Sequence, residues 1–129
     1  MPHIIIECSG NVAERRDLQA LVDAVHAAAL ADGLPALDAL RTRVVIASPY
    51  RIADGDPDNA FVAITVRIAP GRDRGAKLTF ITTVLDAAER ELSRAQDSLA
   101  IAYSIEVQEI DAQLRINRNH VRERMEAGR

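Results

Sequence analysis

Two hydrophobic periods alternate along the chain, and their order predicts strands separated by long helices. Residues 3–8 form a short apolar, β-branched run that is typical of a buried strand. In residues 60–68 and 101–110 large apolar side chains recur at every second position, so each segment predicts a strand with one buried face. A further strand is predicted over residues 40–48. The inward positions are expected to be Val62, Ile64, Val66 and Ile68 in the third strand and Ile101, Tyr103, Ile105 and Val107 in the fourth.

Apolar residues recur at helical spacing in two longer segments, from about Val12 to Asp32 and from about Asp73 to Gln96. Asn11 is expected to cap the first helix, with Glu14 in the capping-box position, and Gly33 is expected to end it. The expected buried stripes are Leu18, Leu21, Val22, Val25 and Ala29 in the first helix and Leu78, Ile81, Leu85, Ala88 and Leu92 in the second.

The elements follow the order β-α-β, turn, β-α-β within one domain of residues 1–129. The turn is Asp54-Gly55-Asp56-Pro57-Asp58, and it separates two pseudo-repeats at about 1–55 and 58–112. A polar, arginine-rich tail follows the second repeat over residues 113–129. A crossover helix implies parallel pairing within each half. We therefore expect an α+β two-layer sandwich: a four-stranded mixed sheet with two helices on one face. Other subunits are expected to cover the other face, and the tail is expected to be a frayed end or an arm that docks on a neighbour.

Composition narrows the class of protein. The 129 residues carry a formal net charge of −3, so the basic field of a nucleic-acid-binding protein is missing. No apolar run approaches the length of a membrane span, and the N-terminus lacks the features of a signal peptide. The single cysteine, Cys8, cannot form an internal disulfide, which fits a reducing compartment. We therefore expect a cytoplasmic protein that binds neither nucleic acid nor membrane.

Pro2 is the first candidate for chemistry. Methionine is generally removed before a small residue such as proline, and the chain then begins with a free secondary amine at the head of an apolar strand. An α-amino group titrates near 7.7–8.0, within the range that general acid–base catalysis requires, and a prolyl amine is intrinsically more basic. Burial and a nearby arginine would lower its pKa and leave a neutral base. This role depends on the removal of Met1.

The chain resembles the tautomerase superfamily, whose members begin with a catalytic proline, and within it the 5-carboxymethyl-2-hydroxymuconate Δ-isomerase family. The opening segment is the most specific part of this resemblance, which spans the chain, whereas the second helix and the tail match only in pattern. The residues that carry it are Met1-Pro2-His3-Ile4-Ile5-Ile6-Glu7-Cys8-Ser9 and Asn11, Leu40-Arg41-Thr42-Arg43-Val44, Ala53-Asp54-Gly55, Ala60-Phe61-Val62 with Thr65, and Gly71-Arg72.

The resemblance implies a tautomerase-like homotrimer with active sites near the subunit boundaries. It also implies an isomerase in which Pro2 shuttles a proton, assisted by two arginines that fall on Arg41 and Arg72. The implied substrate is a small anionic, unsaturated carboxylate of aromatic catabolism, a dienol tricarboxylate, and no metal or organic cofactor is implied. Arginine suits this task because its planar fork holds a carboxylate through two parallel bonds and can stabilise an enolate. Which arginine binds the carboxylate and which stabilises the enolate stays open.

Other basic residues have simpler interpretations. Arg43 and Arg67 are expected to be solvated or to form ion pairs between subunits, and His3 to be a structural strand histidine. The spacing of His3, His26 and His120 matches no recognised metal site.

Two alternatives to the isomerase remain at this stage. Other members of the superfamily are hydratases, dehalogenases or decarboxylases of small unsaturated acids, which keep the proline protonated. A trimeric binding protein without catalysis is the second alternative, and retention of Met1 would favour it.

Overall fold

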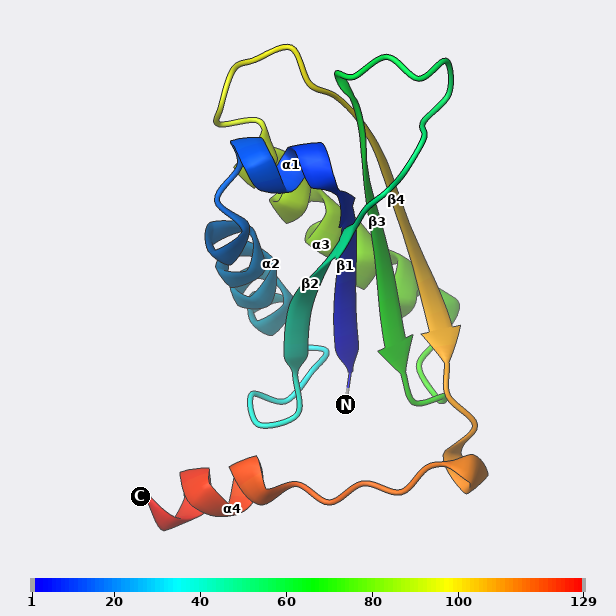
Figure 1. Ribbon diagram of the computed structural model, residues 1–129. Helices are drawn as coiled ribbons and strands as arrows, with labels where there is room; N and C mark the ends of the chain where they lie inside the picture. The colour runs from blue at the N-terminus through cyan, green and yellow to red at the C-terminus, as the bar shows by residue number, and fades with distance from the viewer. Residues whose placement is uncertain (1, 129) are drawn as a thin grey trace.

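The computed structural model describes residues 2–128 and consists of a four-stranded sheet with helices packed on one side (Figure 1). The sheet order is β2-β1-β3-β4, with β1 parallel to β2, β3 parallel to β4, and β1 antiparallel to β3. The predicted α+β sandwich and its parallel pairs are thus confirmed. The elements are β1 (His3–Ser9), α1 (Gly10–Arg15), α2 (Leu18–Asp32), β2 (Arg41–Ala47), β3 (Asn59–Ile68), α3 (Arg74–Leu92), β4 (Ala100–Glu109), a 3-10 turn (Ala112–Leu114) and α4 (His120–Ala127).

The core lies between the sheet and helices α2 and α3. Strand residues alternate in burial as the sequence predicts, because successive side chains point to opposite faces. Phe80 is the only aromatic side chain among the buried residues that the structure describes, and the rest of the core cluster is aliphatic apart from Cys8. The largest fully buried aliphatic side chains are Ile4, Ile6, Leu21, Ile64, Ile68, Leu92, Val12, Val25, Val62, Val66 and Val84.

The first helical segment is broken, so the prediction of one helix from Val12 to Asp32 is wrong. Arg16 is extended, with φ −134° and ψ 152°, and separates α1 from α2. Its guanidinium, on a side chain only 7% exposed, binds both carboxylate oxygens of Asp97 and the Leu92 carbonyl. Asp17 then starts α2 by accepting a bond from the Ala20 N–H at 3.0 Å. These long-range bonds hold Arg16 away from helical geometry, which helical periodicity alone does not reveal.

Asn11 is not the expected helix cap. Ser9 occupies the N-cap position of α1, and Asn11 is inside the helix and only 5% exposed. The Asn11 amide donates to the Pro57 carbonyl at 3.2 Å and the Asn59 carbonyl at 2.7 Å, and its oxygen accepts from Ser9 Oγ at 2.7 Å. The side chain therefore joins α1 to the start of β3 instead of closing a local cap.

Replacing Asn11 with alanine is expected to lower the free energy of unfolding by about 2–3 kcal/mol, because two carbonyls and one hydroxyl lose a buried partner. Urea denaturation measures this loss. Gln19→Ala is the matched control, since Gln19 is exposed on α2 and its change is expected to stay within about 0.5 kcal/mol. Equal stabilities of the two variants would contradict the proposed importance of Asn11.

Helix α3 is shorter than predicted and turns a slightly different face to the core. It ends at Leu92 instead of Gln96, and Asp73 caps it by accepting from the Ala76 N–H at 2.7 Å. Leu78, predicted to be buried, is 53% exposed. The buried positions are Phe80, Val84, Ala87, Ala88 and Leu92, so the face of α3 that packs on the core includes Phe80 and leaves Leu78 out.

The tail contacts its own chain through the start of α4 and is not a frayed end, whereas the other expectation, an arm that docks on a neighbour, stays a prediction. The Asn119 amide donates to the Asp38 carbonyl at 3.0 Å, and Arg122 Nε donates to the Asp38 carboxylate. In Figure 1 the tail crosses below the end of the sheet at which the chain begins. Asp38 belongs to the loop between α2 and β2, so this loop anchors the start of α4 at that end of the sheet.

The second face of the sheet carries no helix among the described residues, and in Figure 1 it faces the viewer. We call it the open face. From the register, the open face comprises His3, Ile5 and Glu7 of β1, Arg41, Arg43 and Val45 of β2, Phe61, Ala63, Thr65 and Arg67 of β3, and Ala102, Ser104, Glu106 and Gln108 of β4.

Among residues 2–128 no helix is long and apolar enough to cross a membrane.

Candidate active site

Pro2 and Arg41 lie side by side at the start of two parallel strands. Pro2 is buried directly before β1, and its carbonyl accepts a bond from the Arg41 backbone N–H at 3.2 Å. The pairing of β1 with β2 places His3 opposite Arg41. The parallel strand pair therefore brings two of the three predicted site residues together.

Arg72 reaches the same end of the sheet through a different connection. It lies four residues after Ile68, the last residue of β3, and because β3 runs antiparallel to β1, the end of β3 lies beside the start of β1. Its guanidinium donates to the Leu34 carbonyl at 3.5 Å, whereas that of Arg41 donates to the Ala39 carbonyl at 2.6 Å. One loop, residues 33–40, thus holds both guanidiniums. Neither forms an ion pair with a carboxylate of residues 2–128, which leaves their charge available to an anion.

His3 is the polar residue next to Pro2, and an arginine fixes its protonation state. Its Nδ1 accepts a bond from the Arg43 guanidinium at 3.0 Å, which requires a neutral imidazole with its proton on Nε2. Burial, followed by the charges of Arg43, Arg41 and Arg67, lowers the pKa of His3 below its ordinary value of 6.5. His3 is therefore neutral at pH 7 and donates through Nε2.

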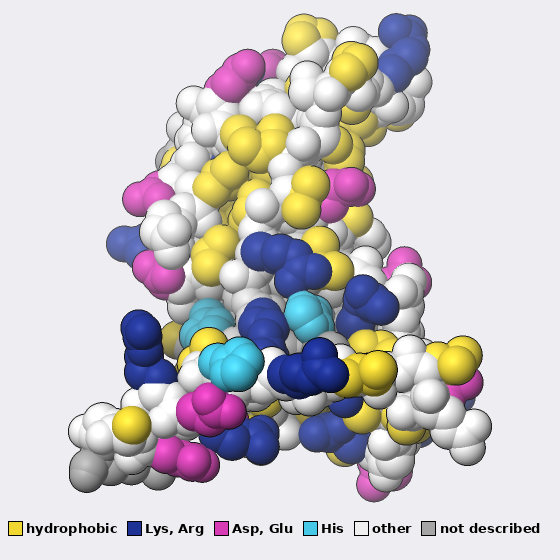
Figure 2. All heavy atoms as spheres, turned by 60° about the horizontal axis from the view of Figure 1, so that its bottom comes forward, with side chains coloured by type: hydrophobic (Ala, Val, Ile, Leu, Met, Phe, Trp, Pro, Cys, Tyr) yellow, Lys and Arg dark blue, Asp and Glu magenta, His cyan; other side chains and the backbone are white. Residues whose placement is uncertain are grey.

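Basic side chains gather across this end of the molecule. Figure 2, which brings the end with the N-terminus and the tail forward, shows Lys, Arg and His side chains spread over it. Arg43 and Arg67, which the sequence predicts to be solvated or in ion pairs between subunits, share a face with His3 and Arg41, and the sequence analysis missed this. The available signal was positional, since Arg41 and Arg43 are two residues apart on one strand and so face the same way.

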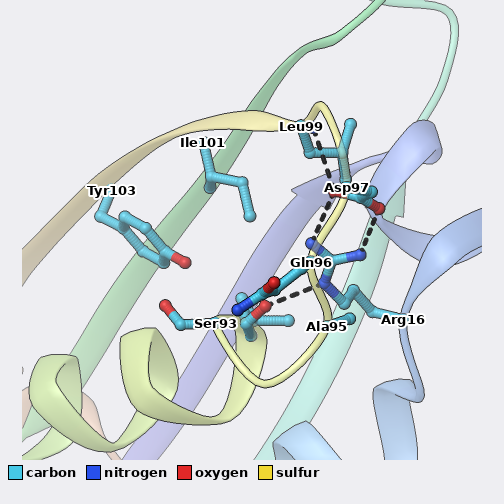
Figure 3. Close-up of a pocket in the computed structure, with 9 residues that line it drawn as sticks. Arg16, Ser93, Ala95, Gln96, Asp97, Leu99, Ile101 and Tyr103 are labelled. Atoms are coloured by element: carbon cyan, nitrogen blue, oxygen red, sulfur yellow. Dashed lines mark hydrogen bonds and ion pairs between the residues drawn. The ribbon is translucent and has the colours of Figure 1, made fainter.

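A depression of about 320 Å³ lies at the opposite end of the sheet, around Arg16 and Tyr103 (Figure 3). The Arg16 guanidinium bonds both oxygens of Asp97, at 2.7 and 3.0 Å, and holds the pKa of that carboxyl at about 2. Arg16 Nε also donates to the Leu92 carbonyl at 2.9 Å. This arginine is thus occupied in tying the loop between α3 and β4 to α1, and we assign the depression a structural role.

Residue 1 lies outside the described residues, so the removal of Met1 and the free amine of Pro2 remain predictions. The other features of the basic end follow from residues 2–128: a buried proline and an adjacent arginine, a second arginine held by the same loop, and a neutral histidine among cations. Such a site can bind an anion and, with a free amine at Pro2, transfer a proton.

Comparison with known proteins gives a consistent result. The family model described as 5-carboxymethyl-2-hydroxymuconate isomerase matches residues 2–125. The 5-carboxymethyl-2-hydroxymuconate Delta-isomerase of Escherichia coli is 31% identical over 121 residues, covering 94% of this chain and 96% of that protein.

Solved structures show the same fold. A crystal structure of 5-carboxymethyl-2-hydroxymuconate delta-isomerase superposes with a TM-score of 0.84 at 20% identity, covering 97% of this chain and 93% of its own. A symmetric trimer of fused wild-type 4-OT superposes with a TM-score of 0.62 at 15% identity, covering 88% and 91%. At these identities the structural likeness supports the fold alone.

Proposed function

Because this chain belongs to the 5-carboxymethyl-2-hydroxymuconate isomerase family and is an isomerase of the tautomerase superfamily, we propose that its substrate is a dienol carboxylate of the 5-carboxymethyl-2-hydroxymuconate type. The observation that carries this proposal is the position of Pro2, buried and bonded to Arg41 at an end of the sheet rich in cations. An anionic substrate needs such a local site because the protein as a whole has a net charge of −3.

In the proposed reaction the Pro2 amine acts first as base and then as acid. The neutral amine takes the proton of the dienol hydroxyl, and the electron pair of the O–H bond forms the ketone C=O. The C=C bond of the enol shifts, and the prolyl ammonium returns the proton to carbon, so no co-reactant is consumed. Burial and a nearby positive charge both disfavour the protonated form of an amine, and Pro2 is buried beside Arg41.

Arg41 and Arg72 are proposed to bind the oxo-acid end and a carboxylate of the substrate. Both guanidiniums are anchored by one bond to loop 33–40 and keep further N–H donors free. Hydrogen-bond donors that are already held in position stabilise the negative charge developing on the enolate more than they stabilise the neutral dienol. The structure supports this role through their common anchor, and their individual tasks stay open.

We also propose that the protein forms a homotrimer that covers the open face. That face carries the apolar side chains of Ile5, Phe61 and Val45, the last 45% exposed, and no helix of residues 2–128 lies over it. The fused 4-OT relative with this fold is a symmetric trimer. Light scattering that gave a monomer mass would contradict this assembly.

The proposed reaction is tested by following the dienol absorbance of 5-carboxymethyl-2-hydroxymuconate with purified protein whose intact mass shows that Met1 is absent. We expect the absorbance to fall faster than in buffer and the ketone to be the sole product, detected by NMR. An unchanged rate would refute the proposed substrate. A hydrated, decarboxylated or dehalogenated product from a related acid would place the protein in another branch of the superfamily.

A further inference from the structure

Three strands bring four cationic or hydrogen-bond-donating side chains to one corner of the open face. His3 begins β1, and its register partners are Arg41 on β2 and Arg67 on β3. Arg43 lies two residues further along β2 and donates to His3 Nδ1 at 3.0 Å. Because paired residues point to the same face, all four side chains lie on the open face.

Every group that this corner offers to a ligand is a donor. Arginine has N–H groups only, and His3 is neutral with its proton on Nε2, since Arg43 occupies Nδ1. No carboxylate of residues 2–128 forms an ion pair with Arg41, Arg43 or Arg67. The nearest acid on the adjacent strand, Glu106, pairs in register with Thr65 and accepts a bond from the Gln108 amide.

We propose that His3, Arg43 and Arg67 form an anion subsite that binds the additional carboxylates of a polycarboxylate substrate, next to the Pro2 amine and Arg41. The proposal rests on the proposed function, because it assigns a place to carboxylates that Arg41 and Arg72 do not bind. Arg43 and Arg67 would contact the substrate. His3 is a positioning residue for Arg43, because its Nδ1 accepts one guanidinium N–H and orients the remaining donors.

The dimensions of the subsite fit an extended anion. Neighbouring strands are about 4.8 Å apart, so Arg41 and Arg67, on either side of β1, are separated by about 10 Å at their Cα atoms. His3 lies between them and directly follows Pro2. A substrate with its reacting carbon at the Pro2 amine therefore has carboxylate sites on both sides of β1.

The proposal requires the subsite to stay accessible in the trimer, and the subsite lies at the edge of the open face. His3 and Arg41 are the first residues of β1 and β2, and Arg67 is the second-last residue of β3. Arg43 and Arg67 are both exposed. A trimer that covers the centre of the face and leaves this end open meets that requirement, and Figure 2 shows basic side chains at this end.

The test compares Arg43→Gln and Arg67→Gln with wild type on 2-hydroxy-2,4-dienoates that carry one, two or three carboxylates. We expect KM for the tricarboxylate to rise about 10-fold or more in each variant, with kcat within about threefold and KM for the monocarboxylate unchanged. Arg90→Gln is the matched control, since Arg90 is exposed on α3 and far from this corner in the sequence and the fold. His3→Leu should reproduce the rise in KM. His3→Gln keeps a hydrogen-bond acceptor for Arg43 and should therefore restore KM to near the wild-type value.

A binding measurement separates this inference from the proposed function. Propane-1,2,3-tricarboxylate is expected to raise the melting temperature of the wild type more than acetate does at equal ionic strength, and to lose this advantage in Arg43→Gln and Arg67→Gln. This result without turnover of any dienol would support the subsite and refute the proposed reaction. Equal KM changes for all three substrates, or no change at all, would refute the subsite. Dissociation of the oligomer by either substitution would also refute it, because the substituted arginine would then belong to an intersubunit ion pair.

Discussion

Converting the Pro2 amine into an amide is expected to lower kcat/KM by about 10³-fold. Insertion of one alanine between Met1 and Pro2 achieves this, because the prolyl nitrogen then belongs to a peptide bond and can no longer accept a proton. General acid–base groups typically contribute 10²–10⁴-fold to a rate, and Pro2 is proposed to act as both base and acid. The measurement is the initial rate of dienol loss, with intact mass to establish the N-terminus of each preparation.

Pro2→Ala is the second variant in this experiment. It keeps a free amine at the same position but makes it primary, so we expect a smaller loss, about 10–100-fold, together with a shifted pH profile. Far-UV circular dichroism of both variants checks that the overall secondary structure is retained. Wild-type activity in the alanine-insertion protein would remove the proline amine from the mechanism.

The strands were predictable because burial on one sheet face imposes a period of two on the sequence. The third strand shows this well: Val62, Ile64, Val66 and Ile68 are all buried as expected, whereas Arg67 is exposed. The helix break at Arg16 could not be predicted in the same way. It depends on Asp97, which is 81 residues away in the sequence, and helical periodicity contains no information about such a partner.

The site shows the same division between local and long-range information. A proline at the head of an apolar strand can be read directly from the sequence, and its proximity to Arg41 follows from the parallel β-α-β unit. The corner formed by His3, Arg43 and Arg67 depends on the register of three strands, and a shift of one residue would turn Arg67 to the helix face. The sequence pattern predicts which strands exist, but the pairing register must come from the structure.

Replacing Arg41 or Arg72 with alanine is expected to lower kcat/KM by about 10²–10³-fold. Removing one donor that stabilises a developing oxyanion typically costs 10²–10³ in kcat, whereas removing a carboxylate clamp acts mainly through KM. The two variants therefore also reveal which arginine does which. The variant with the larger loss in kcat identifies the arginine at the oxo-acid end, and the variant with the larger rise in KM identifies the carboxylate clamp.

Lysine at each position sharpens this comparison, because it keeps the charge but loses the planar, two-point contact. We expect Arg41→Lys and Arg72→Lys to recover only part of the lost activity. Arg90→Ala controls for the loss of an exposed arginine elsewhere on the surface.

The common anchor on loop 33–40 gives one more expectation. Because the Arg41 and Arg72 guanidiniums are bonded to carbonyls of the same loop, the effects of the two substitutions on kcat should be less than additive in the double variant. Unaltered kcat/KM in both single alanine variants would refute the assignment of these arginines, and strictly additive losses would show that the shared loop does not couple them.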